Sequence, residues 1–377
     1  MPNPIVRSSL ARAGALLACA ALWGCAETRV ATVPADLREG PLEVVATTQQ
    51  QVTGIAVSRT GRVFLNFPRW IGEVSPSVAE VDGSGGLKPY PDEAWNRWDG
   101  KPESAREHLV CVQSVWAEGD SLWILDPASP QMAGVVPGGA KLVRVNLDSN
   151  AVTRVYPFDA QTAPQKSYLN DLRFTPDLSH AFITDSGLGA LVVMDVRTGR
   201  SRRLLENDPR LKAEPDARIV VEGRPVRNAE GGTPQVHADG IAMDPRGEFL
   251  YLHALTGTKL YRVPVAALLD EALPSEQLAA KVEQVSVTPP ADGMLTDAQG
   301  NVLVTDLEHN AVVTVPRGGG QPTQLFSDPR LLWPDSLAMD AQGRVYVTAS
   351  QIHRMPWFLG GKDERRTPYL VLRFTPR

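Results

Sequence analysis

The chain has 377 residues, of which 43% are apolar, and a formal net charge of −5 at pH 7. This length and apolar content are enough to bury a large core. The 38 Lys and Arg residues do not outnumber the 43 Asp and Glu residues, so the charge balance excludes a strongly basic surface. We therefore predict no nucleic-acid partner.

The N-terminus has the pattern of an export signal. Arg7 and Arg12 precede the apolar stretch AGALLACAALWGC, which is too short for a comfortable membrane span. The stretch ends in LWGC, which resembles the bacterial lipobox, in which the Cys becomes the lipidated first residue of the mature chain. We predict a lipoprotein-type signal over residues 1–24, with lipidation of Cys25; plain signal cleavage nearby is the alternative.

This interpretation also predicts where the protein is located. Cys25 is followed by Ala26 and Glu27, with no adjacent Asp, which favours the outer membrane over the inner one. We expect a secreted or periplasmic protein that contacts the membrane only through its lipid anchor. Residues 25–40 are polar and aperiodic, and they are predicted to form a tether. If Cys19 is removed with the signal and Cys25 carries the lipid, Cys111 has no partner for a disulfide within the chain.

After residue 40, a pattern of two alternating apolar strands joined by a Gly or Asp turn occurs six times. We call the residue that opens each copy its lead residue. The lead residues recur about 56 residues apart on average, and they are Thr53, Gln113, Asn170, Asp239, Asp292 and Asp335. Short strands repeated at such a period predict an all-β, six-bladed β-propeller over residues 41–377. Strand-like segments at both ends predict that the N- and C-terminal strands pair and close the ring. We expect a monomer.

In a propeller the innermost strands start near the central axis, so the lead side chains should form a ring at one end of the channel. The second strands return to the same end and should supply a slightly wider ring, made of Asn66, Asp126, Asp185, His253, Asp306 and Thr348. Asp239 is not needed for its own turn, because Asp244, Pro245 and Gly247 already supply the turn chemistry. Asp239, Asp335, His253, Asp185 and Asp306 are therefore the predicted ligand-binding residues.

The acidic lead residues leave two interpretations open. Carboxylates that converge from neighbouring blades repel one another unless a cation or a proton lies between them. Oxygen ligands without Cys suit a hard divalent cation such as Ca²⁺ or Mg²⁺, whereas a water-filled polar channel needs no metal. His237, two residues before Asp239, is a candidate for proton transfer. The chain has no G-x-S-x-G, Gly-rich phosphate loop or H-E-x-x-H motif, so these enzyme classes find no support.

Several blocks of sequence together resemble the bacterial branch of the major royal jelly protein/yellow family. They include SLWILDPAS, SYLNDLRF, AFITDSGLGALVVMDVRTG and DGIAMDPRGEFLYLHALTG, in this order. The resemblance implies a secreted six-bladed propeller related to dopachrome-converting proteins and to proteins that bind small amines or sterols. The cysteines of the insect members are missing here.

A more distant resemblance is to the gluconolactonase/senescence-marker propellers. LNDL, ADGI and ADGM are similar to the positions that hold a divalent metal there, which implies Asn170, Asp239 and Asp292 as metal ligands and Asp292 as a catalytic base. The first-blade Glu of that family has no counterpart, because Thr53 occupies the lead position. We therefore predict a protein that binds a small organic ligand in its channel, with a metal-dependent lactonase-like hydrolase or a dopachrome-tautomerase-like isomerase as the alternative.

Overall fold

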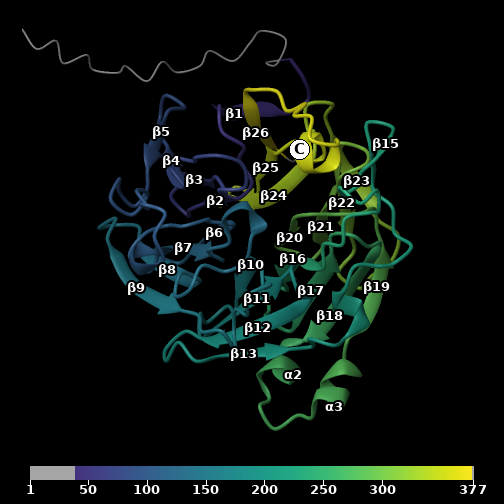
Figure 1. The fold of residues 1–377 in the computed structure, drawn as a ribbon. Helices are drawn as coiled ribbons and strands as arrows, with labels where there is room; N and C mark the ends of the chain where they lie inside the picture. Colours follow the sequence, from purple (N-terminus) through teal and green to yellow (C-terminus); the bar gives the residue numbers. More distant parts are fainter. Residues whose placement is uncertain (1–38, 376–377) are drawn as a thin grey trace, which may run out of the picture.

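Short alternating strands joined by tight turns produce six four-stranded antiparallel sheets around a central axis (Figure 1). The structure is a computed structural model, and it describes residues 39–375. The predicted signal, Cys25 and nearly all of the predicted tether lie outside these residues. Within residues 39–375, no helix is long and apolar enough to cross a membrane. The predicted six-bladed β-propeller is confirmed.

Each of the first three blades is formed by four strands that follow one another in the chain. Blade 1 contains β2 (Ile55–Val57), β3 (Val63–Asn66), β4 (Val78–Val81) and β5 (Leu87–Pro89). Blade 2 contains β6 (Ser114–Glu118), β7 (Ser121–Asp126), β8 (Lys141–Asn146) and β9 (Val152–Pro157). Blade 3 contains β10 (Leu169–Phe174), β11 (His180–Asp185), β12 (Ala190–Asp195) and β13 (Ser201–Leu204).

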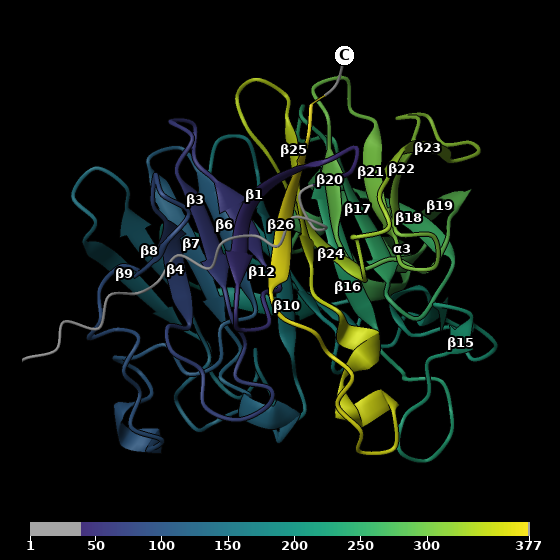
Figure 2. The same cartoon turned by 90° about the horizontal axis from the view of Figure 1, so that it is seen from above.

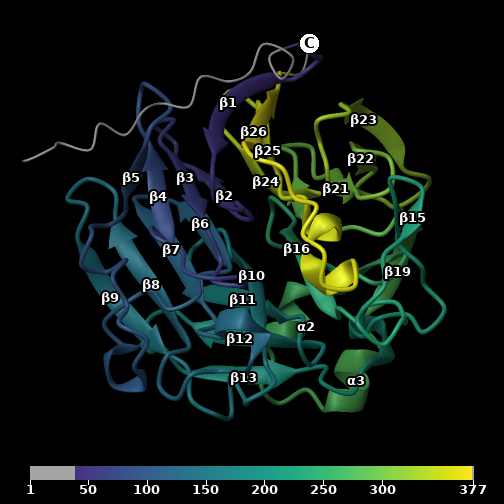
Figure 3. The same ribbon diagram turned by 45° about the horizontal axis from the view of Figure 1, so that its top comes forward.

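Blades 4 and 5 are also formed by consecutive strands, whereas blade 6 joins the two ends of the described chain. Blade 4 contains β16 (Ala238–Met243), β17 (Phe249–Ala254), β18 (Lys259–Pro264) and β19 (Glu283–Val287). Blade 5 contains β20 (Met294–Thr296), β21 (Val302–Asp306), β22 (Ala311–Val315) and β23 (Thr323–Ser327). Blade 6 contains β24 (Pro334–Met339), β25 (Val345–Ala349), β26 (Tyr369–Phe374) and β1 (Glu43–Thr48). Pairing of β1 with β26 (Figure 3) confirms the predicted closure by the terminal strands.

Two short α-helices, a two-stranded hairpin and several 3-10 turns lie outside the blades in residues 39–375. The Ala- and Leu-rich segment after β18 forms α2 (Val265–Leu269) and α3 (Ser275–Ala279). The long insertion between blades 3 and 4 carries the hairpin of β14 (Val220–Val221) and β15 (Arg224–Pro225). Short 3-10 turns cover Pro102–Ser104, Pro130–Met132, Pro209–Leu211, Ile352–Arg354 and Pro356–Phe358. Figure 2 shows β15 and the last two turns on the same side of the ring.

The hydrophobic core lies between adjacent blades, because alternate residues of a strand face opposite neighbours. In β11, Phe182 packs into the cluster between blades 3 and 4, whereas Ile183 packs into the cluster between blades 2 and 3. A cluster of this kind fills each of the six junctions between blades. The inner strands are therefore held firmly around the axis, and they fix the positions of the lead residues.

Candidate functional site

Three of the six lead residues lie at irregularities at the start of the inner strands. The pairing register shifts between Leu169 and Leu172 in β10, between Ala238 and Gly240 in β16, and between Pro334 and Leu337 in β24. Such a bulge re-aims a side chain and ends regular pairing. Asn170, Asp239 and Asp335 all lie within these shifts.

The glycine that follows a lead Asp allows neighbouring inner strands to approach closely. A Cβ on Gly240 would lie 2.9 Å from the carbonyl oxygen of Asp292. A Cβ on Gly293 would lie 2.1 Å from the carbonyl oxygen of Asp335. Both distances are too short for a side chain, so the Asp-Gly pairs bring the carboxyl groups of blades 4, 5 and 6 together.

Five of the six lead residues line one cavity of about 290 Å³, which we call the lead cavity. They are Gln113, Asn170, Asp239, Asp292 and Asp335. Thr53 is the exception, because it is fully buried and its hydroxyl oxygen accepts a hydrogen bond from Asn66. The predicted convergence of the lead residues on one end of the channel is therefore found for five blades.

The walls of the lead cavity are apolar and largely aromatic. They come from the loops that connect the inner parts of the blades, and the aromatic members are Trp70, Tyr168, Trp333, Trp357 and Phe358. The other apolar residues of the lining are Met132, Ile219, Val226, Pro234, Val236, Leu255, Ile352 and Met355. Among residues 39–375, no Lys, Arg or His lines this cavity. An apolar wall with a few converging polar groups is typical of a small-molecule site.

A chain of hydrogen bonds orients the amide side chains at the floor of the cavity. The indole N–H of Trp70 donates to the Tyr168 hydroxyl (2.6 Å), which donates to Gln113 Oε1 (2.8 Å). Gln113 Nε2 donates to Asn170 Oδ1 (3.4 Å), and Asn170 Nδ2 donates to Asp239 Oδ2 (2.8 Å). This series of hydrogen bonds gives one carboxyl oxygen of Asp239 a donor and fixes the orientation of the Gln113 and Asn170 amides.

The three carboxyl groups at the floor hold protons more tightly than exposed carboxyl groups do. Burial, followed by the charges of neighbouring Asp residues, raises the pKa of Asp239 and of Asp335 well above the usual range. Burial also raises the pKa of Asp292, to about 7, against the opposing effect of the Trp333 indole, which donates to Asp292 Oδ2 at 2.8 Å. Near neutral pH, negative charge therefore resides first on Asp292.

Comparison with known proteins identifies the family. Residues 117–369 match the family model described as "Major royal jelly protein". The chain belongs to the major royal jelly protein family. A comparison with curated proteins found no match.

Solved structures show the same fold at low sequence identity. A gluconolactonase from Xanthomonas campestris shares 11% identity at a TM-score of 0.54, over 91% of this chain and 94% of that one. A luciferin-regenerating enzyme shares 11% identity at a TM-score of 0.53, over 89% and 95%. An aldose sugar dehydrogenase from Streptomyces coelicolor, solved with PQQ bound, shares 12% identity at a TM-score of 0.52, over 89% and 98%.

The two histidines singled out from the sequence do not line the lead cavity of this royal jelly family member. Nδ1 of His237 accepts a hydrogen bond from the backbone N–H of Ala213 (2.9 Å), and burial lowers the pKa of this imidazole. His253 is buried, with Nε2 2.8 Å from the Thr288 hydroxyl, and burial lowers its pKa to about 4. Both histidines are therefore neutral near pH 7, and neither of them lines the cavity.

The wider ring of carboxylates is engaged in structural contacts. Asp185 accepts from the backbone N–H groups of Tyr168, Gly187 and Leu188, and it forms a buried ion pair with Arg203 (2.9 Å). Asp306 accepts from the N–H groups of Glu308 and His309 and contacts the His309 ring. Neither Asp185 nor Asp306 lines the lead cavity, whereas Asp239 and Asp335 do.

The residues predicted to bind a metal meet at the floor in an arrangement that does not present three oxygens to an ion. Asn170 directs its amide nitrogen, and not its oxygen, at Asp239. One oxygen of Asp292 is already bonded to Trp333. Within residues 39–375, no group of three or more His, Cys, Asp or Glu side chains is placed to hold a metal ion. A divalent cation at Asn170, Asp239 and Asp292 stays a prediction.

Ile219 and Val226, which flank the β14–β15 hairpin, line the lead cavity, and the hairpin is attached to the loop between β25 and β26 of blade 6. Glu222, at the hairpin turn, accepts from Arg354 Nε and lies 2.9 Å from His353 Nε2. These contacts lower the pKa of Glu222 to about 2. His353 stacks on Trp333, with 5.9 Å between the ring centroids. The hairpin is thereby connected to the indole that bonds to Asp292.

We expect Glu222→Gln to loosen this hairpin without unfolding the blades. The variant loses the charge that holds Arg354, which should cost about 1–2 kcal/mol locally. Amide hydrogen exchange at Val221 and Arg224 should become roughly tenfold faster, while exchange in β11 stays unchanged. Glu230→Gln, an exposed change in the same insertion, is the control. Equal exchange rates in the two variants would show that Glu222 does not anchor the hairpin.

Proposed function

We propose that this protein binds a small aromatic amine in the lead cavity. The observation that carries the proposal is a floor of three buried carboxyl groups below aromatic walls, to which the described part of the chain contributes no basic side chain. An ammonium group at the floor would offset the repulsion among Asp239, Asp292 and Asp335. The ring would pack against indole side chains such as Trp333, where both dispersion and cation–π attraction favour it.

The size of the cavity supports a small ligand. A volume of about 290 Å³ lies at the lower end of the range for small-molecule sites, which is roughly 300–1,000 Å³. The family resemblance to proteins that bind small amines agrees with this class of ligand. A long peptide or a sugar chain would find few hydrogen-bonding groups on the apolar walls.

The test is calorimetric titration with tryptamine at pH 6, 7 and 8. Because the carboxyl pKa values are raised, the empty floor is partly protonated near pH 7, and a bound cation should displace protons. The affinity should therefore rise with pH, by up to about tenfold per unit for each proton released. Indole-3-propionate, which has the same ring and an opposite charge, should not bind. Equal binding of the two probes, or tryptamine affinity independent of pH, would contradict the proposal.

A second candidate function is proton transfer between two positions of a bound substrate, as in a tautomerase. The observation in its favour is that Asp239 and Asp335 retain protons where Asp292 ionises, so one cavity holds both acids and a base. This second function would be supported if the parent converts dopachrome and the Asp292→Asn variant does not. Metal-dependent lactone hydrolysis has no comparable support in the arrangement of Asn170, Asp239 and Asp292.

A further inference from the structure

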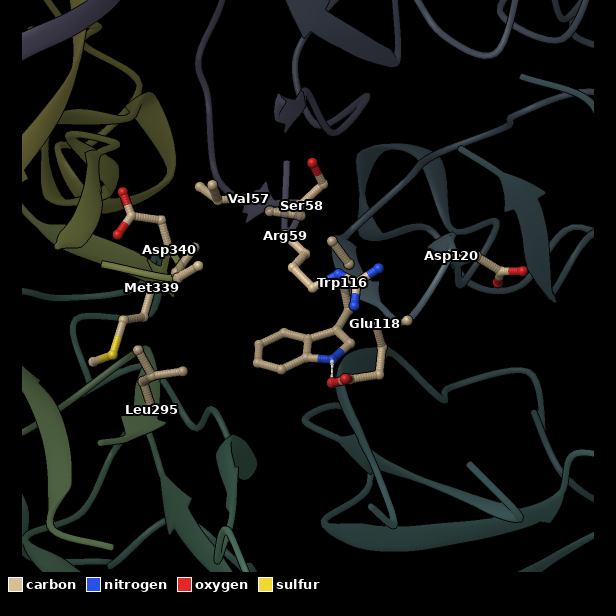
Figure 4. Close-up of a pocket in the computed structure, with 14 residues that line it drawn as sticks. Val57, Ser58, Arg59, Trp116, Glu118, Asp120, Leu295, Met339 and Asp340 are labelled. Atoms are coloured by element: carbon tan, nitrogen blue, oxygen red, sulfur yellow. Dashed lines mark hydrogen bonds between the residues drawn. The ribbon is translucent and has the colours of Figure 1, made fainter. Parts of the chain in front are cut away.

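A second cavity lies at the opposite end of the channel, where the hairpins of blades 1, 2 and 6 turn. We call it the distal funnel; it has a volume of about 570 Å³. Its lining includes Val57, Arg59, Trp116, Glu118, Leu295 and Met339 (Figure 4). The distal funnel and the lead cavity share no lining residue. The two cavities are therefore formed by separate sets of residues.

Aligning the six repeats shows which residues lie between the two cavities. The third residue after each lead residue should face the axis at the next level of the channel. In chain order these residues are Ala56, Trp116, Arg173, Ala242, Leu295 and Ala338. Three of the six are alanines, and the two largest side chains, Trp116 and Arg173, belong to adjacent blades.

Arg173 extends across the channel. From β10 in blade 3, its Nη2 donates to the carbonyl oxygen of Met294 in blade 5, at 2.6 Å. Its Nη1 lies 2.9 Å from Asp171 Oδ2, and the other oxygen of Asp171 accepts from the Ser114 hydroxyl in blade 2. Only 4% of the Arg173 side chain is exposed. One guanidinium therefore connects three blades beneath the lead carboxyl groups.

Trp116 covers the guanidinium on the side of the funnel. The centre of the Arg173 guanidinium lies 4.0 Å from the centroid of the Trp116 ring. From β6 in blade 2, Trp116 packs against the core cluster that contains Leu295 and Leu337 of blades 5 and 6. Figure 4 shows the indole in the middle of the funnel, with Leu295 and Met339 opposite. We call Arg173 and Trp116 the channel plug.

We propose that the channel plug makes the lead cavity blind-ended and that Arg173 limits the length of the ligand. This proposal rests on the proposed function. If the ammonium group of a ligand meets the carboxyl floor, any substituent on its nitrogen must extend toward Asp171 and Arg173. The guanidinium and its ion pair occupy that space. The site would therefore select primary amines and exclude amines with a long N-alkyl chain.

The experiment compares two double variants that lose the same charges but differ in volume. Asp171→Asn/Arg173→Ala removes the buried ion pair and empties the space, whereas Asp171→Asn/Arg173→Met removes the pair and fills it. Binding of tryptamine and N-octyltryptamine is measured for both variants and for the parent. The parent and the Met variant should prefer tryptamine by roughly 100-fold, a factor of the size that steric exclusion in a pocket supplies. The Ala variant should bind the two amines with similar affinity.

Crystal structures of the two variants separate the failure of this proposal from the failure of the proposed function. If tryptamine does not bind the parent, the amine proposal fails, and the structures alone then decide the role of the plug. A lead cavity that extends down to the Trp116 indole in the Ala variant, and one of unchanged depth in the Met variant, is the expected result. A lead cavity of unchanged depth in the Ala variant, or tight binding of N-octyltryptamine by the parent, would overturn the proposal. Asp171→Asn/Arg173→Val, with a residue suited to a strand, replaces the Ala variant if that protein does not fold.

Discussion

Asp292→Asn should lower the affinity for tryptamine by roughly 100-fold at pH 8, the loss expected for one buried charge-assisted contact. Asp292 has the carboxyl group of the floor that ionises first, because the Trp333 indole donates to it. Asn keeps an oxygen for that indole and a similar volume, so the change removes the charge and little else. Calorimetric titration of the variant and the parent measures the effect.

The matched control for Asp292→Asn is Glu118→Gln. It also removes one negative charge, but Glu118 lines the distal funnel on the other side of the channel plug. If the field of the whole protein attracted the amine, both variants would lose affinity to a similar extent. Affinity lost only in Asp292→Asn places the ammonium at the lead carboxyl floor. Unchanged affinity in Asp292→Asn would remove that carboxyl group from the site.

The Asp292→Asn variant should also be more stable to unfolding than the parent at high pH. Because burial raises the pKa of Asp292 to about 7, the folded parent keeps a proton that the unfolded chain releases above about pH 4. The free energy of unfolding of the parent therefore falls as the pH rises from about 4 to about 7. Asp292→Asn lacks this penalty and should gain a few kcal/mol relative to the parent at pH 8 and nothing at pH 4. Urea unfolding of both proteins at the two pH values measures the difference.

The propeller and the lead ring could be predicted from the sequence because both depend on local patterns. Alternation, Asp-Gly pairs and turn residues repeat in each blade, and closure follows from strands at both ends. The cavity walls could not be predicted in this way. Trp70, Trp333 and Trp357 lie in loops of different lengths between strands, and their convergence depends on how the blades are arranged in space.

The channel plug has a signal in the alignment of the six repeats. At the third position after the lead residue, Arg173 replaces an alanine or another apolar residue of the other repeats. A charged residue in an alternating buried strand needs a partner, and Asp171, two residues earlier, was available. The wider ring was harder to interpret, because an Asp that caps loops and an Asp that binds a ligand have the same sequence pattern.

Asp126 of the wider ring illustrates this structural role. It is buried at the end of β7. Its carboxylate accepts hydrogen bonds from the backbone N–H groups of Val110, Cys111 and Ala128. Lys141 lies 2.8 Å from Asp126 Oδ2, and its Nζ also donates to the carbonyl oxygens of Ala105 and Gly139. Both side chains are almost completely inaccessible to water. The pair therefore fixes the loops that support Tyr168 and Trp70 in the cavity wall.

Lys141→Met should destabilise the fold by about 3–5 kcal/mol, the usual cost of leaving one partner of a buried ion pair without its counter-charge. Met has a similar length and lies in the same strand environment, so lost volume contributes little. Arg200→Met is the control, because its ion pair with Glu271 is largely exposed and should be worth at most about 1 kcal/mol. Urea unfolding at pH 7 measures both free energies.

The double variant Asp126→Asn/Lys141→Met should recover part of the loss, because Asn can still accept from the backbone without a buried charge. Equal losses in Lys141→Met and Arg200→Met would show that the Asp126–Lys141 pair does not stabilise the loops at the lead cavity.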